Sequence, residues 1–528
     1  MMCTLYLTAF DRVIRHWMKI LVNYKCVSMI SKNKKEVRED NPIEDLKKLN
    51  VDRQANGGIM KFEKLYINGE YVDSTSGEFI EVENPATNEI IGRVPRGNAE
   101  DVEKAALAAK EAFKTFSLTS FDERIEIMKK FAAYLKENLD EIAELITKEL
   151  GSPIKFSKKT HVQSQINRVE KYINIVKDYE FSRRDGGALI VKEPAGVVGC
   201  LTPWNYPLGQ IIQKIVFAIL AGNTIVLKPS QQTPLVAYYV VDGLEKAGLP
   251  KGVLNLVTGV GGEVGNAIAT SKYIDVISFT GSTKGGSEVA KLAQETVKRT
   301  TLELGGKSPA IFLDKENLEL GVKQLLAIVI ENTGQTCSAW SRAIVLESVR
   351  EEFEAEIKKQ FPDFKVGDPN DRNSIAGPLA SKKQYDKVTD YIEKGKEIAD
   401  VLIEGNYDFP EKGYYVNPIV FNDVKNDAVI ARDEIFGPVL CVIYVKDKKE
   451  AIEVANDTDY GLSGAVFGNQ EEALEVAKLV RTGTITVNDG PGEIGTPFGG
   501  YKLSGYGREG GIEGLEEYLE TKTINVRA

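Results

Sequence analysis

Short apolar segments alternate with longer helix-like stretches through the middle of the chain. Five such segments carry glycine or proline near their ends, and they cover residues 196–203, 224–230, 253–259, 276–281 and 300–306. The stretches 208–222 and 233–248, which separate the first three segments, have the length and composition of helices. Buried parallel strands read as continuous apolar runs, and helical crossovers join them. The alternation therefore predicts an α/β fold built on a parallel sheet.

Similar patterns flank this region. Asn98 can cap a helix, and a second helical run covers residues 122–150. The apolar face of the first helix would hold Val102, Ala105, Ala106, Ala109 and Phe113. Later in the chain we expect strands at 343–348, 439–445 and 483–489, and a helix at 349–361. Because no low-complexity linker interrupts the chain after residue 60, we expect two closely packed α/β domains.

The first 59 residues differ from the rest. Over residues 1–35 the single acidic residue, Asp11, stands among the bases Arg12, Arg15, Lys19, Lys25, Lys32, Lys34 and Lys35. The apolar runs here are too short to span a bilayer, and no secretory signal is evident. An amphipathic organelle-targeting helix is one interpretation. We favour a leader over residues 1–59 that is disordered or absent from the native protein, with Met60 as the true start, because a regular strand-and-turn pattern begins there.

Composition narrows the possible partners. The net charge of −10 and a pI near 5.3 argue against binding to nucleic acid. The five cysteines are widely scattered and form no CxxC pair, which fits a reducing, cytoplasmic setting rather than a disulfide framework. Histidine and cysteine do not cluster as zinc or iron ligands do, so no metal site is expected.

A loop of small and polar residues follows each of the five apolar segments. The loops read "TPWNYP", "KPSQ", "TGVGGEVG", "FTGS" and "ELGG". Ligands of open α/β sheets bind beyond the carboxyl ends of the strands, so these loops predict a cofactor crevice. One such loop could merely end a strand, but five together favour a binding site. Two matches to GxGxxG, at 490–495 and 505–510, do not join a strand to a helix in a βαβ unit, and we reject them as dinucleotide fingerprints.

Cys337, in "ENTGQTCSAW", lies among glycine, amide and hydroxyl neighbours that are typical of a nucleophile. A thiol attacks as the thiolate, and a histidine base is the usual activator. The chain has two histidines, His16 and His161, and neither lies in a recognisable motif. A lone cysteine is more often a small buried hydrophobe, so this segment alone leaves both interpretations open.

Several motifs together resemble the NAD(P)-dependent aldehyde dehydrogenase superfamily, from about residue 60 to the C-terminus. They are "TPWNYP", "AGNTIVLKPS", "FTGS", "LELGGKSP", "GQTCSA", "EIFGPV" and "PFGGYKLSGYGREGG". "LELGGKSP" followed by "GQTC" is highly specific. The resemblance implies a Rossmann-like cofactor domain, an α/β catalytic domain and a β-arm that pairs subunits into homodimers or homotetramers. The implied ranges are 60–175 with 195–302 for the cofactor domain, 303–510 for the catalytic domain, and 176–194 with 519–528 for the arm.

The resemblance also assigns roles to single residues. Cys337 matches the nucleophile, Glu303 the general base and Asn205 the oxyanion donor. Lys214 and Glu509 match supporting charges, although either could be a structural ion-pair partner. The implied cofactor is NAD, with NADP as an alternative, and no metal is implied. The implied cofactor contacts are Thr202, Trp204, Lys228, Gln231, Gly261, Gly265, Ser282, Glu434 and Phe436.

The implied reaction oxidises an aldehyde to a carboxylic acid through a thiohemiacetal and a thioester on Cys337. A histidine is not required, because the cationic nicotinamide ring would favour the thiolate. Glu303 would activate the water that hydrolyses the thioester, which favours release of a free acid over transfer to coenzyme A. A CoA-acylating or semialdehyde-specific enzyme and a non-catalytic protein of the same fold remain alternatives. The presence of Cys337, Glu303 and Asn205 weighs against the non-catalytic one.

Two further expectations concern specificity. Family correspondence lines the aldehyde tunnel with Tyr206, Gln210, Gln213, Thr336, Ser338, Gly492 and Phe498. This set is more polar than a fatty-aldehyde tunnel would be, but it does not identify the aldehyde. NAD-dependent members of the family commonly have a glutamate where this chain has Gln231, so we expect NAD to work and NADP to be tolerated. We expect no membrane or nucleic-acid partner.

Overall fold

The predicted parallel strands lie side by side in one sheet of eight strands. This computed structural model describes residues 60–526, so the predicted leader and the last two residues of the predicted arm lie outside the described residues. The strand order is β20-β12-β11-β8-β9-β10-β2-β3. The strands are β2 (Leu65–Ile67), β3 (Glu70–Val72), β8 (Val197–Leu201), β9 (Thr224–Lys228), β10 (Leu254–Leu256), β11 (Val276–Thr280), β12 (Arg299–Glu303) and β20 (Gly505–Tyr506).

The five central strands, β8 to β12, are mutually parallel, and β2, β3 and β20 are antiparallel additions at the edges. Their residues are almost entirely buried, because helices cover both faces of the sheet. The prediction of an α/β fold is confirmed. Cys200 of β8 is fully buried and belongs to the core.

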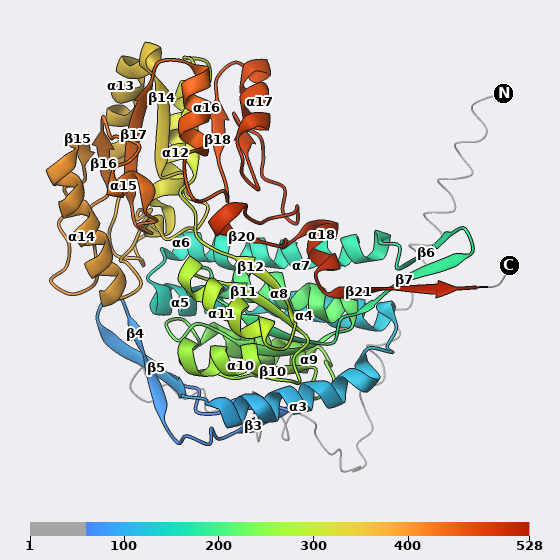
Figure 1. Ribbon diagram of the computed structural model, residues 1–528. Coiled ribbons are helices and arrows are strands. Elements are labelled where there is room, and N and C mark those ends of the chain that lie inside the picture. The colour runs from blue at the N-terminus through green and yellow to red at the C-terminus, as the bar shows by residue number, and fades with distance from the viewer. Residues whose placement is uncertain (1–59, 527–528) are drawn as a thin grey trace, which may run out of the picture. The chain divides into compact units, whose positions relative to one another are not determined.

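Helices from separate parts of the chain cover the two faces of this sheet (Figure 1). One face is covered by α3 (Ala99–Phe116), α10 (Asn266–Thr270) and α11 (Thr283–Gln294). The other is covered by α8 (Pro207–Ala221) and α9 (Val236–Lys246), on which α4 (Phe121–Glu137) and α7 (Ser164–Asp178) pack. Between α4 and α7 lie α5 (Leu139–Leu150), α6 (Ile154–Phe156) and the π-helical turn η2 (Ser157–Gln163).

Two details of these helices follow from single side chains. The Asn98 side chain accepts the N–H groups of Glu100 and Asp101 and caps α3, as predicted. The helical run predicted over 122–150 is divided into α4 and α5 at Asn138, whose backbone is not helical. Its side-chain amide donates to the Tyr134 carbonyl at 2.8 Å, and such local bonding competes with helix continuation.

The second half of the chain forms a sheet of seven strands in the order β15-β16-β17-β14-β13-β18-β19. All neighbours are parallel except β15 and β16. The strands are β13 (Pro309–Phe312), β14 (Arg342–Leu346), β15 (Asp400–Glu404), β16 (Ile419–Asn422), β17 (Val439–Val445), β18 (Ala465–Phe467) and β19 (Thr486–Val487). On one face lie α12 (Leu318–Ile330) and α13 (Arg350–Gln360), and on the other α14 (Lys382–Ile398), α16 (Lys448–Asn456) and α17 (Gln470–Leu479).

Two small sheets complete the described chain. One contains β1 (Met60–Lys61), β5 (Glu89–Pro95) and β4 (Phe79–Asn84). The other, in the region of the predicted arm, contains β21 (Leu519–Asn525), β7 (Ala188–Pro194) and β6 (Ser182–Asp185) and extends away from both large sheets in Figure 1. These strands begin only at Ser182, because residues 176–178 complete α7. The remaining short elements are η3 (Gly261–Gly265), η4 (Glu331–Gly334), η5 (Glu347–Val349), η6 (Phe361–Asp363), α15 (Val429–Arg432), η7 (Lys502–Ser504) and α18 (Gly511–Glu516).

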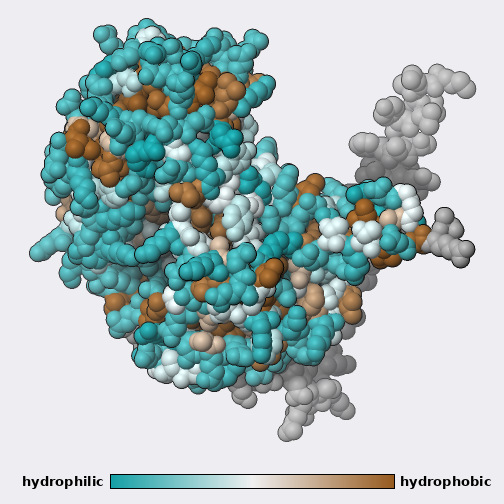
Figure 2. Space-filling model, in the orientation of Figure 1, coloured by the Kyte–Doolittle hydropathy of each residue, from teal (hydrophilic) through white to brown (hydrophobic). Residues whose placement is uncertain are grey.

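The face shown in Figure 2 is mostly hydrophilic, with apolar residues in small, separate patches that include the projecting strands. Within the described range, no helix combines the length and apolarity needed to cross a bilayer. The rejected motif at 505–510 does run from β20 into α18, but β20 pairs antiparallel with β12 and no βαβ unit forms.

The connection between the two sheets positions the candidate site. β12 ends at Glu303, and the chain passes through Gly305 and Gly306 into β13 of the second sheet. The carboxyl ends of the first sheet's parallel strands therefore meet the loops that precede β14 and β17. Ligands bind beyond the carboxyl ends of open α/β sheets, so this junction is the expected crevice.

Candidate active site

A cavity of about 160 Å³ lies where the two sheets meet. The first sheet contributes Pro203, Trp204, Asn205, Gln210, Thr280, Gly281 and Ser282. The later part of the chain contributes Leu304, Gly305, Cys337, Gln384, Lys387, Glu434 and Phe436. The structure thus brings the candidate nucleophile together with the predicted oxyanion donor and several predicted cofactor contacts.

Cys337 is half-buried in the loop between η4 and β14. Three residues shortly before it, Asn332, Thr333 and Gly334, have left-handed backbone with φ of 51°, 57° and 70°. A β-branched residue rarely adopts this conformation, so Thr333 stores strain that its surroundings must compensate. Gly334 is required here, because a Cβ would lie 2.3 Å from the Gly437 carbonyl.

Hydrogen bonds hold this strained loop in place. The Gln335 side chain donates to the Asn332 carbonyl at 2.9 Å and accepts the N–H of Ala380 at 2.8 Å. The Asn332 amide donates to the Asn205 carbonyl at 3.0 Å, and the Asn205 amide donates to the Gln335 carbonyl at 2.9 Å. Asn205 and the Cys337 loop therefore fix each other, and the second N–H of the Asn205 amide remains available as a donor.

The environment of Cys337 disfavours its thiolate in the ligand-free protein. Burial, and to a smaller extent the nearby carboxylates of Glu434, Glu303 and Glu509, raise the pKa of the Cys337 thiol to about 12. A backbone hydrogen bond from Ser338 opposes this shift. The thiol is therefore protonated at neutral pH until another group stabilises its charge.

Glu303 lies at the end of β12 and is 2% exposed. Neither of its carboxylate oxygens has a hydrogen-bond partner among the described residues. Its pKa lies well above the ordinary value of 4.5, mainly because of burial and then because of the neighbouring charge of Glu509. A carboxyl group with a raised pKa and free oxygens can act as a general base toward water.

Lys214 and Glu509 form a buried ion pair below the cavity. Their side chains are 0% and 2% exposed, and the Lys214 ammonium donates to Glu509. It also donates to the hydroxyls of Thr280 at 2.7 Å and Ser278 at 3.2 Å. With the Gln213 amide oriented to suit its neighbours, its nitrogen donates to the second Glu509 oxygen at 2.5 Å. All members of this network are hydrogen-bonded, so the Lys214–Glu509 pair can stabilise the fold. The charge of Glu509 also raises the pKa of Glu303.

A second cavity, of about 520 Å³, continues along the first sheet and shares Thr280 and Ser282 with the first. Predicted cofactor residues line it, namely Thr202, Lys228, Gly261, Gly265 and Ser282. At Gly261 and Gly265 an added Cβ would meet no atom within 4 Å, so the glycines leave open space beside the backbone. Ser282 caps α11 by accepting the N–H of Gly285 at 3.2 Å.

Lys228 is buried at the end of β9, where its ammonium donates to the Pro229 carbonyl at 2.8 Å. Burial lowers the pKa of Lys228 to about 8, so an anionic or hydroxyl-rich ligand would satisfy an underpaired cation. Gln231, three residues later, is exposed and does not line the cavity.

Glu434 and Phe436 bound the other side of the first cavity. Glu434 accepts a hydrogen bond from the N–H of Gly306 at 2.9 Å. Its carboxylate also lies close to Gly305, where an added Cβ would be 2.2 Å from a carboxylate oxygen of Glu434. Glycine at 305 is therefore required for this approach. The Phe436 ring meets Trp204 edge-on at 5.4 Å between centroids.

Of the predicted tunnel residues, Gln210 lines the same cavity as Cys337. The Tyr206 hydroxyl bonds the Thr336 hydroxyl at 2.8 Å, and Gln210 is buried with an unpartnered carbonyl oxygen. Phe498 pairs through its backbone with Glu509, Ser338 is half-buried and Gly492 is exposed.

His161 is a buried residue near this site, and no motif predicted a role for it. Its ring is 0% exposed and packs 5.0 Å from the Tyr206 ring and 5.3 Å from the Phe156 ring. Burial lowers the pKa of His161 to about 3, so the ring is neutral. Asn332 is close enough to oppose this shift, although neither ring nitrogen completes a hydrogen bond to a described residue. No local sequence signal marks it, because η2 brings it to Tyr206 through an irregular helical turn.

Two residues of α14, Gln384 and Lys387, also went unpredicted. Their amide and ammonium groups donate to the carbonyls of Phe436 and Glu434, both at 2.7 Å. They thereby fix the segment that carries the two predicted cofactor contacts.

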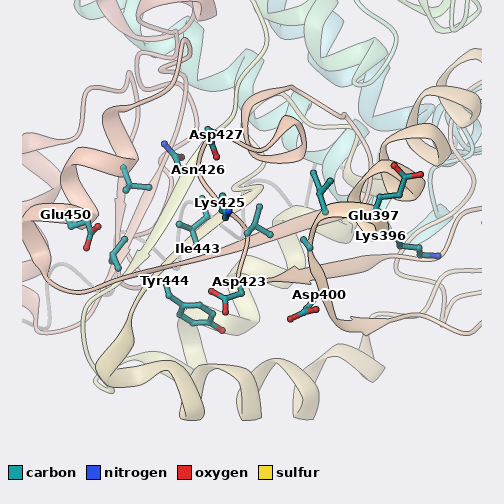
Figure 3. Close-up of a pocket in the computed structure, with 15 residues that line it drawn as sticks. Lys396, Glu397, Asp400, Asp423, Lys425, Asn426, Asp427, Ile443, Tyr444 and Glu450 are labelled. Carbon is teal, nitrogen blue, oxygen red and sulfur yellow. The ribbon is translucent and has the colours of Figure 1, made fainter.

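A larger cavity, of about 860 Å³, lies elsewhere, at the carboxyl ends of β16 and β17 (Figure 3). It contains none of the predicted site residues, and charged side chains such as Lys396, Asp400 and Asp423 surround it. Lys396 pairs with Glu404 at 3.1 Å and Asp423 with Arg350 at 3.2 Å. Because Lys396 and Asp423 are paired at the surface and this cavity holds none of the predicted site residues, the smaller cavity at Cys337 is the better candidate for chemistry. No cluster of metal-ligating side chains occurs between residues 60 and 526.

Comparison with known proteins identifies the family. Residues 71–524 match the model of the aldehyde dehydrogenase family. The chain belongs to the aldehyde dehydrogenase family. A Staphylococcus saprophyticus protein assigned to the aldehyde dehydrogenases is 44% identical over 470 residues, covering 88% of this chain and 99% of that protein. This aldehyde dehydrogenase is therefore an oxidoreductase that acts on aldehydes.

Solved structures of the family have the same fold. Aldehyde dehydrogenase C of Pseudomonas syringae, solved as a mutant with NAD⁺ and octanal, matches this aldehyde dehydrogenase with a TM-score of 0.86 and 41% identity, covering 88% of this chain and 96% of that one. Betaine aldehyde dehydrogenase of Staphylococcus aureus, solved with NAD⁺, matches with a TM-score of 0.84 and 35% identity over 88% and 95% of the two chains.

Proposed function

We propose that this enzyme oxidises an aldehyde to the free carboxylic acid with NAD, through a thiohemiacetal and then a thioester on Cys337. The observation that carries this proposal is the convergence of Cys337, Asn205 and Glu303 from three separate segments on the junction of the two sheets. Each of the three has the chemical character that the reaction needs.

The residues around the second cavity fit a nicotinamide dinucleotide. The open space at Gly261 and Gly265 suits close approach of a pyrophosphate, and the buried Lys228 ammonium suits a ribose hydroxyl. Trp204, Glu434 and Phe436 would hold the end of the cofactor nearest Cys337. Bound NAD supplies the hydride acceptor of the reaction. The two solved relatives above contain NAD⁺, which supports the same cofactor here.

Cys337 and Asn205 perform the first half of the reaction. The Cys337 thiol releases its proton to solvent, its sulfur adds to the aldehyde carbonyl, and the resulting alkoxide accepts hydrogen bonds from the free N–H of the Asn205 amide and from the Cys337 backbone. The alkoxide would then expel hydride to the bound acceptor, which leaves a thioester on Cys337. Because Asn205 is already fixed by Gln335 and Asn332, it needs little reorganisation when charge develops. Loss of one such donor typically lowers the rate about 100- to 1000-fold.

Glu303 performs the second half. Its two unpartnered oxygens can take a proton from the water that attacks the thioester, and its raised pKa makes it a stronger base than an ordinary carboxylate. A base in this position favours release of a free acid over transfer to coenzyme A. Lys214 and Glu509 act on this step through the charge next to Glu303.

Further features bear on the location, the assembly and the substrate and cofactor specificity of the enzyme. The described cysteines Cys200, Cys337 and Cys441 are free thiols, in keeping with a cytoplasmic enzyme. The projecting strands β6, β7 and β21 provide the arm that would pair subunits into a homodimer or homotetramer. The polar residues around Cys337 favour a polar aldehyde over a long alkyl one, and NADP would be tolerated at the exposed Gln231.

The test is NADH formation with a panel of aldehydes, with and without coenzyme A, together with analysis of the carboxylic product. The parent enzyme should form NADH and free acid without coenzyme A, and Cys337→Ala should form neither while still binding NAD. A strict need for coenzyme A would replace this function with the acylating reaction. Undiminished oxidation by Cys337→Ala would remove the proposed nucleophile.

A further inference from the structure

Glu149 is a buried carboxylate that belongs to neither cavity of the candidate active site. It lies in the last turn of α5 and is 1% exposed. One of its oxygens accepts the N–H of Leu235 at 2.9 Å, and the other accepts the N–H of Val236 at 3.3 Å. A fully buried glutamate is rare unless it is hydrogen-bonded, so these two contacts explain how it is accommodated.

These contacts cap a helix from outside. Val236 is the first residue of α9, and Leu235 at its N-cap provides no side-chain hydrogen bond. The first N–H groups of a helix have no partner within the helix and carry partial positive charge. Glu149 supplies the acceptors that the sequence around Leu235 lacks.

The helix start is also the end of the loop over residues 229–235, which follows Lys228 and contains Gln231. Two other bonds hold the same loop. The Thr233 hydroxyl donates to the Trp204 carbonyl at 3.1 Å, and the Gln232 amide donates to the Ser381 hydroxyl at 3.0 Å. Glu149 differs from the other two anchors because it accepts two backbone N–H groups at the start of α9.

Glu149 cannot easily move away from its partners. α5 ends at Gly151, which has a φ of 81° and lies against Pro378 so closely that a Cβ would stand 2.6 Å from it. Slightly later, the N–H of Ile154 donates to the Pro369 carbonyl at 2.8 Å. The end of α5 is therefore clamped against the second half of the chain. Burial raises the pKa of Glu149 to about 8, which the two backbone hydrogen bonds oppose.

We propose that Glu149 is a positioning residue for the cofactor: it fixes the start of α9 and thereby the loop that follows Lys228, whose buried ammonium would meet a ribose hydroxyl. This inference rests on the proposed use of NAD. Glu149 does not touch the reacting atoms, so its influence is confined to cofactor affinity and leaves the chemistry at Cys337 unchanged.

Glu149→Gln tests this proposal. The glutamine amide has only one oxygen, and its NH₂ would face the backbone N–H of Leu235 or Val236. One of the two hydrogen bonds to the start of α9 is therefore lost. The KM for NAD should rise about tenfold, as expected from the loss of one strong hydrogen bond. The kcat should stay within about twofold and the KM for the aldehyde should not change. The matched control is Glu144→Gln, which alters an exposed glutamate of the same helix and should resemble the parent.

The measurements are NAD titration by calorimetry without aldehyde, steady-state kinetics in each substrate, and the melting temperature. Weaker NAD binding by Glu149→Gln alone, with kcat retained, supports the proposal. Equal NAD affinity in parent and variant overturns it, as does an equal rise in both KM values, which would indicate general loosening. If Glu149→Gln does not fold, Glu149→Asp, which keeps the carboxyl group but has a shorter reach, gives the same readout. Failure of the parent itself to bind NAD would instead refute the proposed function and, with it, this inference.

Discussion

Burial controls the acid–base state of the side chains around the candidate nucleophile. Cys337 and Glu303 both have raised pKa values, and Lys228 has a lowered one, so each group is pushed toward its neutral form. The site therefore stores little charge of its own before its ligands bind. A histidine base is not needed in this account, because the cationic nicotinamide ring of the bound cofactor would stabilise the Cys337 thiolate.

The raised pKa of Glu303 predicts a pH dependence. Only the ionised carboxylate can act as a base, and a raised pKa moves its ionisation upward from 4.5 toward neutrality. The rate of thioester hydrolysis should therefore rise with pH and level off once Glu303 is ionised. Single-turnover measurements between about pH 5.5 and 9 should show this rise of the hydrolysis rate in the parent enzyme and no such rise in Glu303→Gln. The same rise in both proteins would mean that another group titrates.

Gln231 predicts the response to NADP. A glutamate at this position would repel a 2′-phosphate, whereas a glutamine can bond a ribose hydroxyl without repulsion. Because Gln231 is exposed, we take the lower end of the Coulomb range, about 1 kcal/mol, or roughly a fivefold effect. Gln231→Glu should lower kcat/KM for NADP by about that factor and leave NAD nearly unchanged. Equal NADP discrimination in the parent and the variant would show that another group rejects the phosphate.

The sequence identified the main candidate residues but not their surroundings. Cys337 and Glu303 stand in specific motifs, whereas Glu149, Gln384 and His161 act across long sequence separations that no local pattern reveals. The pairing of Lys214 with Glu509, 295 residues apart, was left open for the same reason.

At the scale of elements, the apolar runs predicted β8 to β12 well because buried parallel strands leave a strong sequence signal. The break between α4 and α5 was missed because it depends on one side-chain hydrogen bond of Asn138. The irregular turn η2 was missed as well, since a π-helix has the same composition as an α-helix. It is this turn that places His161 against Tyr206.

The buried His161 predicts acid sensitivity. Its pKa falls from the ordinary 6.5 to about 3 in the folded protein, so the unfolded chain binds a proton first as the pH falls. Its contribution to stability is complete above pH 6.5 and is lost progressively as the pH falls toward 3, by about 2 kcal/mol at pH 5. The melting temperature should drop less between pH 7.5 and pH 5 in His161→Gln than in the parent. An identical drop in both would show that His161 does not carry this effect.

At the scale of the whole molecule, neither sheet contains a complete site. The first sheet provides Asn205 and Glu303, and the second half of the chain provides Cys337 and Glu434. The loop that holds Cys337 is bonded to Asn205 from the first sheet, so the relative position of the two halves fixes the distance between nucleophile and oxyanion donor. Such precision is expected where reacting groups must be held in register.

The most direct test of the central claim, a hydrolytic reaction through Cys337, is intact-protein mass spectrometry of Glu303→Gln mixed with NAD and an accepted aldehyde. Without the base the thioester should form and persist. We predict one burst of NADH per active site and a mass increase equal to one acyl group, with peptide analysis placing it on Cys337. Cys337→Ala should show neither. Full turnover by Glu303→Gln without an adduct, or an adduct on a different residue, would contradict the mechanism.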